Sequence, residues 1–137
     1  MHTPDHATGA VLRPREITPH ERGGGARTTP LVTRKVGSTS MLNGITEFAP
    51  NAAIPLHTHN CEESVMVLEG DAIAELDGVQ HRMGANDTTW VAAGIPHRFI
   101  NASDSHRMRI FWTYASVEAT RTIVATGDTR AIDSERG

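Results

Sequence analysis

The sequence has little cysteine, few aromatic residues and no long apolar run. Cys61 is the single cysteine of 137 residues, so the chain can form no internal disulfide and has no Cys-x-x-Cys metal or redox motif. No apolar stretch approaches the length that spans a bilayer, and the first residues show neither the basic start nor the apolar run of a secretion signal. We therefore expect a cytoplasmic protein without a membrane partner.

The sequence also lacks blocks of like charge. Its formal net charge is -3, and acidic and basic residues are interspersed. The arginines form no basic stripe with interleaved aromatic residues, which is the pattern typical of a nucleic-acid-binding surface. We expect no nucleic-acid partner.

The chain has the length of one domain with its own core. Residues 1–30 are polar, and the run from Glu21 to Pro30 is too rich in glycine for the interior of a helix or strand, so we expect a flexible N-terminal arm. Either this arm folds over a cavity or a partner subunit, with Arg22 or Arg27 meeting an anionic substrate, or it is a disordered leader. The sequence leaves both interpretations open.

From Leu31 onward, short stretches rich in Val, Ile, Thr and aromatic residues alternate with turn signals roughly every eight to twelve residues. This pattern predicts an all-β sandwich or barrel over residues 31–118, followed by a C-terminal extension and tail over residues 119–137. Asp77-Gly78 predicts a two-residue type I′ hairpin. Residues 108–114 form the last clear strand, residues 117–124 a short helix or an edge strand, and residues 128–137 a loose tail.

The stretch PLHTHNCEES, residues 55–64, concentrates potential metal ligands. Because side chains alternate along a strand, His57 and His59 point to one face and can share an ion. Imidazole suits first-row transition metals, and a carboxylate from Glu62 or Glu63 would add a third ligand. This spacing predicts a metal site.

Parity in the following strand favours Glu63 as the carboxylate ligand. Glu63 shares a face with Val65 and Val67, and valines are the residues that a buried inner face needs. Glu62 then supports the ligand histidines, since such rings usually hold their other nitrogen against a carboxylate or carbonyl.

A further histidine, His97, follows a Gly-x-Pro turn at the first position of an expected strand, with Phe99 and Asn101 on its face. His97 is therefore a candidate for the last ligand. Cys61 has the parity of His57 and His59, which would place its thiol near the metal. The chain has to turn before Glu63, however, and this favours Cys61 as a small hydrophobic residue.

Two segments resemble the paired motifs of the cupin family. HTHNCEESVMVLEG is similar to the first motif, whose spacing is matched by His57, His59, Glu63 and Gly70. NDTTWVAAGIPHRFIN is similar to the second motif, which is matched by His97 and Asn101.

Asn86 and Ala92 stand where the second motif usually has glycine and proline. Neither removes a ligand. Asn tolerates the left-handed conformation of a turn glycine, so Asn86, and likewise Asn51, should preserve its turn.

The resemblance implies a double-stranded β-helix, a jelly-roll barrel whose mouth holds a metal on three histidines and one glutamate: His57, His59, His97 and Glu63. It also implies a homodimer with exchanged arms. Hydrophobic and aromatic residues line the cavities of this family, which suggests a substrate pocket formed by Val65, Val67, Phe99, Met108 and Trp112. The aromatic residues Trp90 and Tyr114 are expected in the barrel core.

Three imidazoles and a carboxylate leave coordination positions open for a chelating substrate and O₂. The leading hypothesis is an Fe(II)-dependent dioxygenase acting on a small organic molecule, with Mn, Ni, Co or Zn as other metals that fit. Glu63 would stay a ligand or act as the catalytic base. Two alternatives stay open: a metal-dependent isomerase, decarboxylase or lyase, and a non-catalytic metal- or small-molecule-binding protein.

Overall fold

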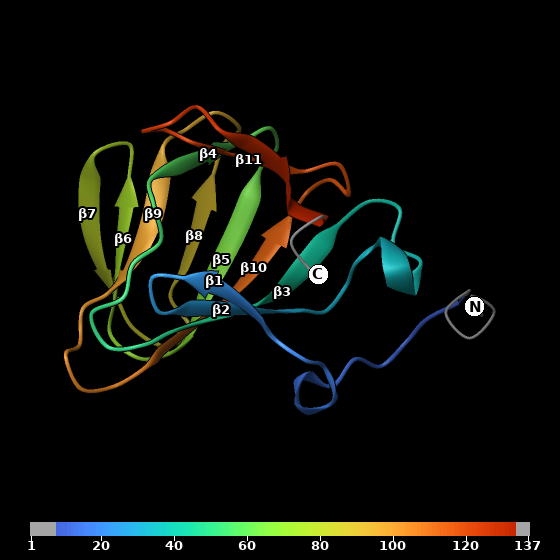
Figure 1. The fold of residues 1–137 in the computed structure, drawn as a ribbon, viewed down its shortest axis with the longest axis horizontal. Helices are drawn as coiled ribbons and strands as arrows, with labels where there is room; N and C mark the ends of the chain where they lie inside the picture. Colours follow the sequence, from blue (N-terminus) through green and yellow to red (C-terminus); the bar gives the residue numbers. More distant parts are fainter. Residues whose placement is uncertain (1–7, 134–137) are drawn as a thin grey trace.

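A computed structural model describes residues 8–133, and strands make up most of this part of the chain (Figure 1). The strands are β1 (His20–Gly23), β2 (Ala26–Pro30), β3 (Leu42–Phe48), β4 (His57–His59), β5 (Glu63–Glu69), β6 (Ala72–Leu76), β7 (Val79–Met83), β8 (Thr88–Val91), β9 (His97–Asn101), β10 (Met108–Tyr114), β11 (Thr120–Ile123) and β12 (Thr129–Ala131). Two short 3-10 helices, η2 (Pro14–Glu16) and η3 (Arg34–Val36), flank the first two strands. No helix in the described residues is long and apolar enough to cross a membrane.

The strands form two six-stranded antiparallel sheets. One sheet has the order β1-β2-β3-β10-β5-β8, and the other has the order β12-β11-β4-β9-β6-β7. We name them the β10 sheet and the β4 sheet. Figure 1 shows the strands curving around a common interior. The all-β jelly-roll fold predicted from the sequence is confirmed.

Alternation of side chains along the strands builds the core between the sheets. β10 lies in the middle of its sheet, between β3 and β5. Its inward residues are all buried, and they are Met108, Ile110, Trp112 and Tyr114. Phe99 of the β4 sheet, only 2% exposed, packs in the same core cluster. The interior is therefore apolar except where particular polar side chains enter it.

The predicted tight turns are present. Asp77 and Gly78 have φ values of 49° and 83° and connect Leu76 to Val79, which are direct partners in the β6–β7 ladder. Positive φ at both central residues is the requirement of a type I′ turn. Asn51 and Asn86 also adopt positive φ, as their expected glycine-like role requires.

The N-terminal segment differs from expectation. β1 and β2 pair as an antiparallel hairpin, and β2 pairs with β3 along its whole length. Gly23, Gly24 and Gly25 all have positive φ and make the turn, so their flexibility serves the connection rather than interrupting the strands. The expectation of a flexible arm is therefore wrong for residues 20–30, while residues 1–7 lie outside the described part.

The C-terminal segment is also more ordered than expected. β11 pairs with β4 on one side and with β12 on the other, so it is an interior strand and not an edge strand. The expectation of a loose tail is wrong for residues 129–133. β12 pairs with β11 at the edge of the sheet, and Ile132 is buried in the core. The two sheets thus extend beyond residues 31–118, while residues 134–137 lie outside the described part.

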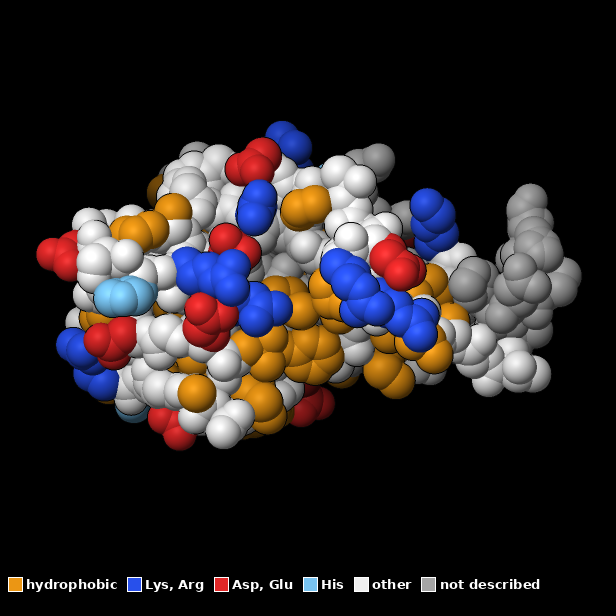
Figure 2. All heavy atoms as spheres, turned by 90° about the horizontal axis from the view of Figure 1, so that it is seen from below, with side chains coloured by type: hydrophobic (Ala, Val, Ile, Leu, Met, Phe, Trp, Pro, Cys, Tyr) orange, Lys and Arg blue, Asp and Glu red, His pale blue; other side chains and the backbone are white. Residues whose placement is uncertain are grey.

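The surface carries mixed charge, as the sequence predicts. Figure 2 shows one face on which arginine and lysine side chains lie beside aspartate and glutamate, with hydrophobic side chains between them. Arg107, for example, contacts both Glu47 and Glu69.

Candidate metal centre

Three buried histidine rings meet inside the barrel. His57 and His59 stand on β4, and His97 opens β9 directly opposite His57 in the ladder. The ring centroids lie 4.5 Å apart for His57 and His97, 4.8 Å for His57 and His59, and 4.9 Å for His59 and His97. The alternation on β4 and the β4–β9 pairing therefore bring together the three histidines that the sequence predicted.

A backbone contact fixes the turn that delivers His97. The amide of Gly94 donates a hydrogen bond of 2.8 Å to the carbonyl of His59, and Gly94 has φ 81°. The Gly-Ile-Pro turn is thus tied to the end of β4, and glycine adopts this positive φ without strain. The turn and the histidine pair form one rigid unit.

Each histidine uses its Nδ1–H on a backbone carbonyl. His57 donates to Pro55 at 2.7 Å, His59 to Thr120 at 2.9 Å, and His97 to Ile95 at 2.8 Å. Because a carbonyl can only accept, these bonds assign the Nδ1 proton and leave Nε2 as the nitrogen available to a ligand. The three ligand atoms lie within 4.8 Å of one another.

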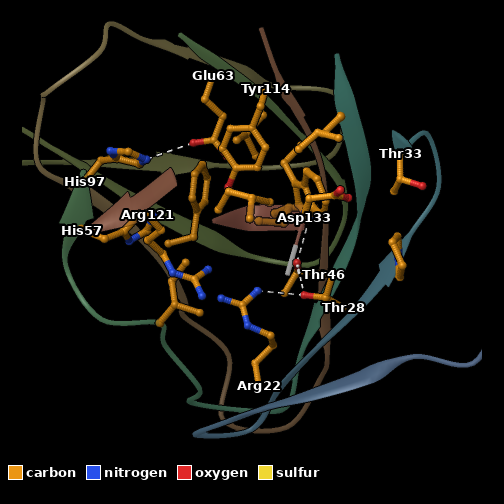
Figure 3. A pocket seen from close by; sticks show the side chains of 18 residues that line it. Arg22, Thr28, Thr33, Thr46, His57, Glu63, His97, Tyr114, Arg121 and Asp133 are labelled. Atoms are coloured by element: carbon orange, nitrogen blue, oxygen red, sulfur yellow. Dashed lines mark hydrogen bonds and ion pairs between the residues drawn. The ribbon is translucent and has the colours of Figure 1, made fainter. Parts of the chain in front are cut away.

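Glu63 enters the same site from the β10 sheet, at the first position of β5. Its Oε1 lies 3.0 Å from His97 Nε2 and 3.4 Å from His59 Nε2. The side chain is 5% exposed. Figure 3 shows the carboxylate directed at His97 across the cavity. The predicted fourth member of the site is in contact with two of the histidines.

Burial and mutual contacts shift the pKa values of His57, Glu63 and His97 in different directions. Burial, followed by the neighbouring His97 and His59, lowers the pKa of His57 to about 3, so this ring is neutral. Burial would raise the Glu63 pKa, but contacts with His59 and His97 outweigh it and lower the value to about 2. Burial works against a charged His97 as well, yet the Glu63 contact leaves its pKa raised. Without a metal, the site holds the Glu63 carboxylate against His97, whose charged form this contact favours, beside a neutral His57.

One fully buried nitrogen of the site has no hydrogen-bond partner. Within residues 8–133, His59 Nε2 is buried and accepts or donates no hydrogen bond, and its 3.4 Å contact with Glu63 is too poorly placed to supply one. An unsatisfied buried polar atom is costly, and a metal ion would satisfy it. Three inward Nε2 atoms beside a carboxylate are a donor set that first-row transition metals prefer. The residues therefore fit a bound metal.

Glu62 does not have the supporting role that we expected. Its exposed carboxylate accepts a 2.7 Å hydrogen bond from Trp90 Nε1, and backbone carbonyls hold the histidine rings instead. Trp90 itself is 63% exposed, so it is not a core residue. Trp90 lies opposite Ser64 on the outer face of the β5–β8 pair, and Glu62, just before β5, has the same parity as Ser64, which explains both corrections.

Cys61 packs partly against the core and is half-buried. Burial raises the pKa of its thiol, which disfavours the thiolate that metal binding or redox chemistry needs. The interpretation as a small hydrophobic residue fits these observations.

An apolar cavity adjoins the histidines. Of the five predicted pocket residues, Val65, Phe99 and Trp112 line it. Val67 and Met108 are fully buried but are not among the lining residues. The alternation of side chains along the strands correctly placed both residues on the inner face. It does not tell which positions along a strand lie beside the cavity.

The cavity also has polar walls that the sequence pattern did not reveal. These residues are Thr28, Thr33, Thr46, Arg121 and Asp133. Arg121 stands opposite His59 in the β11–β4 ladder. A single threonine or arginine in a strand is ordinary, so only the pairing of distant strands gives these residues a place in the site.

Comparison with known proteins identifies a family and several relatives. The model of the cupin domain matches residues 44–114. The chain is similar to polyketide synthase CurC of Streptomyces cyaneus, with 33% identity over 102 residues, 74% of this chain and 66% of CurC. It is similar to tetracenomycin polyketide synthase protein TcmJ of Streptomyces glaucescens, with 28% identity over 96 residues, 69% of this chain and 64% of TcmJ. The matched region is thus just under two thirds of either relative.

Solved structures show the same fold. The polyketide cyclase RemF from Streptomyces resistomycificus superposes with a TM-score of 0.72 over 90% of this chain and 84% of its own, at 19% identity.

Proposed function

The chain belongs to the cupin family, and on that premise we propose that it is a metal-dependent enzyme that closes a ring within a polyketide-type β-diketone. The observation that carries the proposal is the group of three inward-facing Nε2 atoms at the wall of an apolar, aromatic cavity. The names of CurC, TcmJ and RemF, two polyketide synthase proteins and a polyketide cyclase, support the substrate class.

A metal held by His57, His59 and His97 would supply a Lewis acid that lowers the pKa of a β-diketone bound through both oxygens. The chain's own contribution begins with the Nδ1–H bonds to Pro55, Thr120 and Ile95. These bonds hold the rings in orientation before the substrate arrives, which is the role of carbonyl partners behind ligating histidines.

Glu63 is the candidate base. Contacts with His59 and His97 hold its pKa low. A metal on the three histidines would bring its own positive charge close to Glu63 and would favour the ionised carboxylate, the form that accepts a proton. Its carboxylate could take the proton from the carbon that attacks the distant carbonyl, or it could stay as a fourth ligand.

The cavity walls would select the folded conformation of the polyketide-type substrate. Val65, Phe99 and Trp112 offer apolar and aromatic surface that excludes water and packs against a flat, ring-forming segment. Ring closure by aldol condensation forms one carbon–carbon bond, moves a C–H proton to the base and releases water. A buried carboxylate such as Glu63 can assist this proton transfer.

A linear, phenyl-substituted triketone tests the proposal. We expect the metal-loaded protein to speed its conversion to the carbocyclic resorcinol, which NMR distinguishes from the pyranone formed by oxygen attack. His57→Ala should abolish the acceleration, whereas His81→Ala, on the exposed face of β7, should not. A product ratio that is unchanged by the wild-type protein would refute the cyclase proposal.

The metal itself is proposed from the donor set. Fe(II) is favoured, as the sequence predicted, and Mn, Ni, Co and Zn also fit three imidazoles and a carboxylate. Elemental analysis of protein purified without added metal distinguishes them.

The dioxygenase chemistry predicted from the sequence is a second candidate, and the same combination of three histidines and Glu63 favours it. It differs from ring closure in consuming O₂ as it oxidises the substrate. Oxygen uptake that depends on both metal and a β-diketone would establish it. Metal binding with neither oxygen uptake nor ring closure would instead favour the non-catalytic binding protein.

A further inference from the structure

A second polar cluster lines the cavity from the β10 sheet, opposite the histidine-bearing β4 sheet. Thr28 of β2 and Thr46 of β3 are direct ladder partners, and their hydroxyl oxygens lie 2.9 Å apart. Arg22 Nη1 donates to Thr28 Oγ1 at 3.1 Å, and Trp112 Nε1 donates to Thr46 Oγ1 at 2.9 Å. Figure 3 shows Arg22, Thr28 and Thr46 in line along the wall of the cavity.

In this row of hydrogen bonds, one threonine hydroxyl hydrogen has no acceptor. Arg22 and Trp112 can only donate, so each threonine oxygen already accepts one bond from outside the pair. Only one of the two hydroxyls can donate to the other. The remaining O–H has no acceptor in the chain of bonds, whichever way the pair is oriented. Thr28 and Thr46 are 7% and 4% exposed and line the cavity, so this hydrogen is available there.

The charge near this cluster favours an anionic acceptor. Arg22 and Arg121 both line the cavity, and both also line an adjoining polar groove with Glu21, Asp128 and Arg130. The two guanidinium groups therefore lie where the cavity meets the surface. Asp133 is the only carboxylate besides Glu63 among the described lining residues. An incoming oxygen anion would meet guanidinium and hydroxyl donors together.

We infer that Arg22, Thr28 and Thr46 form a second anchoring site, which binds a carboxylate or enolate oxygen of the substrate at the end away from the histidines. In combination with the proposed function, on which this part rests, the substrate is an elongated molecule with a β-diketone at one end and an anionic oxygen at the other. The anchoring site itself consists of protein groups alone, so it binds such an oxygen without the metal.

Benzoate is a probe that tests the anchoring site alone. The protein is labelled with ¹⁵N and freed of metal with a chelator, and the indole N–H signals of Trp90 and Trp112 are followed during a benzoate titration. Trp112 donates into the site, whereas Trp90 donates to Glu62 on the surface. We expect the Trp112 signal to shift with saturation and the Trp90 signal to stay. A Trp112 signal that does not respond overturns the inference.

Variants identify the groups responsible. Thr28→Val with Thr46→Val removes both hydroxyls, and benzoate affinity should fall by about tenfold or more, the loss typical of a hydrogen bond to a charged group. Thr28→Ser with Thr46→Ser should retain the benzoate affinity, because serine keeps both hydroxyls. The matched control is Thr122→Val with Thr129→Val, because these threonines form the same kind of hydroxyl pair, at 2.8 Å, on the exposed side of β11 and β12. Equal losses in both valine pairs would overturn the inference.

Arg22→Gln is a second test that leaves the buried threonines in place, in case the double valine variant does not fold. It should weaken benzoate binding about tenfold as well. Unchanged affinity in this variant contradicts the assigned role of the guanidinium.

A pair of diketones separates the two proposals. Benzoylacetone carries only the diketone, and its para-carboxylate analogue carries both ends. With metal-loaded protein we expect the analogue to bind about tenfold more tightly, and the double valine variant to lose this preference while retaining benzoylacetone. If neither diketone binds but benzoate does, the anchoring site stands and the proposed function fails. If both diketones bind equally and benzoate does not bind, the anchoring site fails and the diketone proposal stands.

Discussion

The histidine side chains are held by their Nδ1–H groups, and this decides how the site responds to the loss of a ring. Each Nε2 has a fixed position because a carbonyl from Pro55, Ile95 or Thr120 holds the opposite nitrogen. No neighbouring histidine can rotate to replace a missing ring without breaking such a bond. Affinity for the metal should therefore depend on all three rings together.

Removing one ring should release the metal. We expect His57→Ala and His97→Ala to lower the metal content of purified protein from about one equivalent to a small fraction, because loss of one of three imidazoles costs orders of magnitude in affinity. Elemental analysis measures the content. His81→Ala is the control, since His81 is exposed on β7. Full metal content in His97→Ala would place the metal elsewhere.

The low pKa of His57 makes the metal-free protein sensitive to acid. The unfolded chain binds a proton at His57 below about 6.5, whereas the folded chain does so only near 3. Glu63 adds to this at lower pH, between 4.5 and about 2. In both windows the unfolded state holds more protons, so the free energy of unfolding falls as pH falls. His97 has the opposite sign, since its raised pKa gives stability at low pH that is lost as pH rises through it.

Urea unfolding of chelator-treated protein at several pH values between 7 and roughly 3.5 checks the sign. We expect stability to decrease with acidification, and His57→Asn to decrease less steeply, because asparagine can still donate to Pro55 but takes up no proton. His81→Asn should behave as the wild type. Equal slopes for wild type and His57→Asn would show that His57 is not the group responsible.

Among single residues, the sequence was informative where parity was sufficient. Two histidines at a spacing of two, and valines in phase with Glu63, were enough to identify the inward face. Glu62 was misassigned because a carboxylate and a backbone carbonyl can hold an imidazole equally well, and only the fold shows that the carbonyls are nearer. Arg121 could not be assigned, since its position depends on the pairing of β11 with β4.

Among the elements, β3 shows how a missing side chain shapes the cavity. Gly44 faces Trp112 in the β3–β10 ladder, and a Cβ atom there would lie 2.6 Å from the indole Cζ2 and 2.7 Å from the Thr29 carbonyl. The indole can therefore lie over Gly44 and reach Thr46 only because residue 44 is glycine.

Gly44→Ala should destabilise the protein by about 1–3 kcal/mol, the usual cost of forcing an additional group into a packed core. It should also shift the Trp112 indole NMR signal, since the ring must move. Gly84→Ala is the matched control, because its Cβ would meet nothing within 4 Å. Urea unfolding measures the change. A Gly44→Ala protein as stable as Gly84→Ala would mean that the neighbouring strands adjust without cost.

The elements that the sequence did not predict share one physical cause. β1, β2 and β12 contain charged residues, glycine or proline, and short segments of this kind gain little from their own propensity. They are strands because neighbours in the sheet satisfy their backbone groups: β3 for the N-terminal hairpin and β11 for β12. The central strands were predictable because their own apolar alternation specifies the buried face.

The oligomeric state of the protein is a further prediction. The family resemblance implies a homodimer, and Trp90 and Met66 are exposed hydrophobic residues near each other on the outer face of the β10 sheet. We expect light scattering during gel filtration to give twice the 14.8 kDa chain mass. Arg107→Ala, in an exposed ion-pair cluster away from Trp90, should leave the mass unchanged, and Trp90→Ser should shift it towards the monomer. A wild-type mass of one chain would contradict the predicted dimer.

The cavity unites residues from near both ends of the chain. Arg22 belongs to the first strand, and Asp133 follows the last, yet both line the cavity that His57 and His97 also line. Contacts between such distant segments form late when a chain folds, because the entropy of closing the intervening loop opposes them. The central strands of the barrel can therefore pack their core before the cavity has formed. We therefore expect the capacity of the cavity to hold a ligand to arise late in folding and to be lost early when either terminal strand detaches.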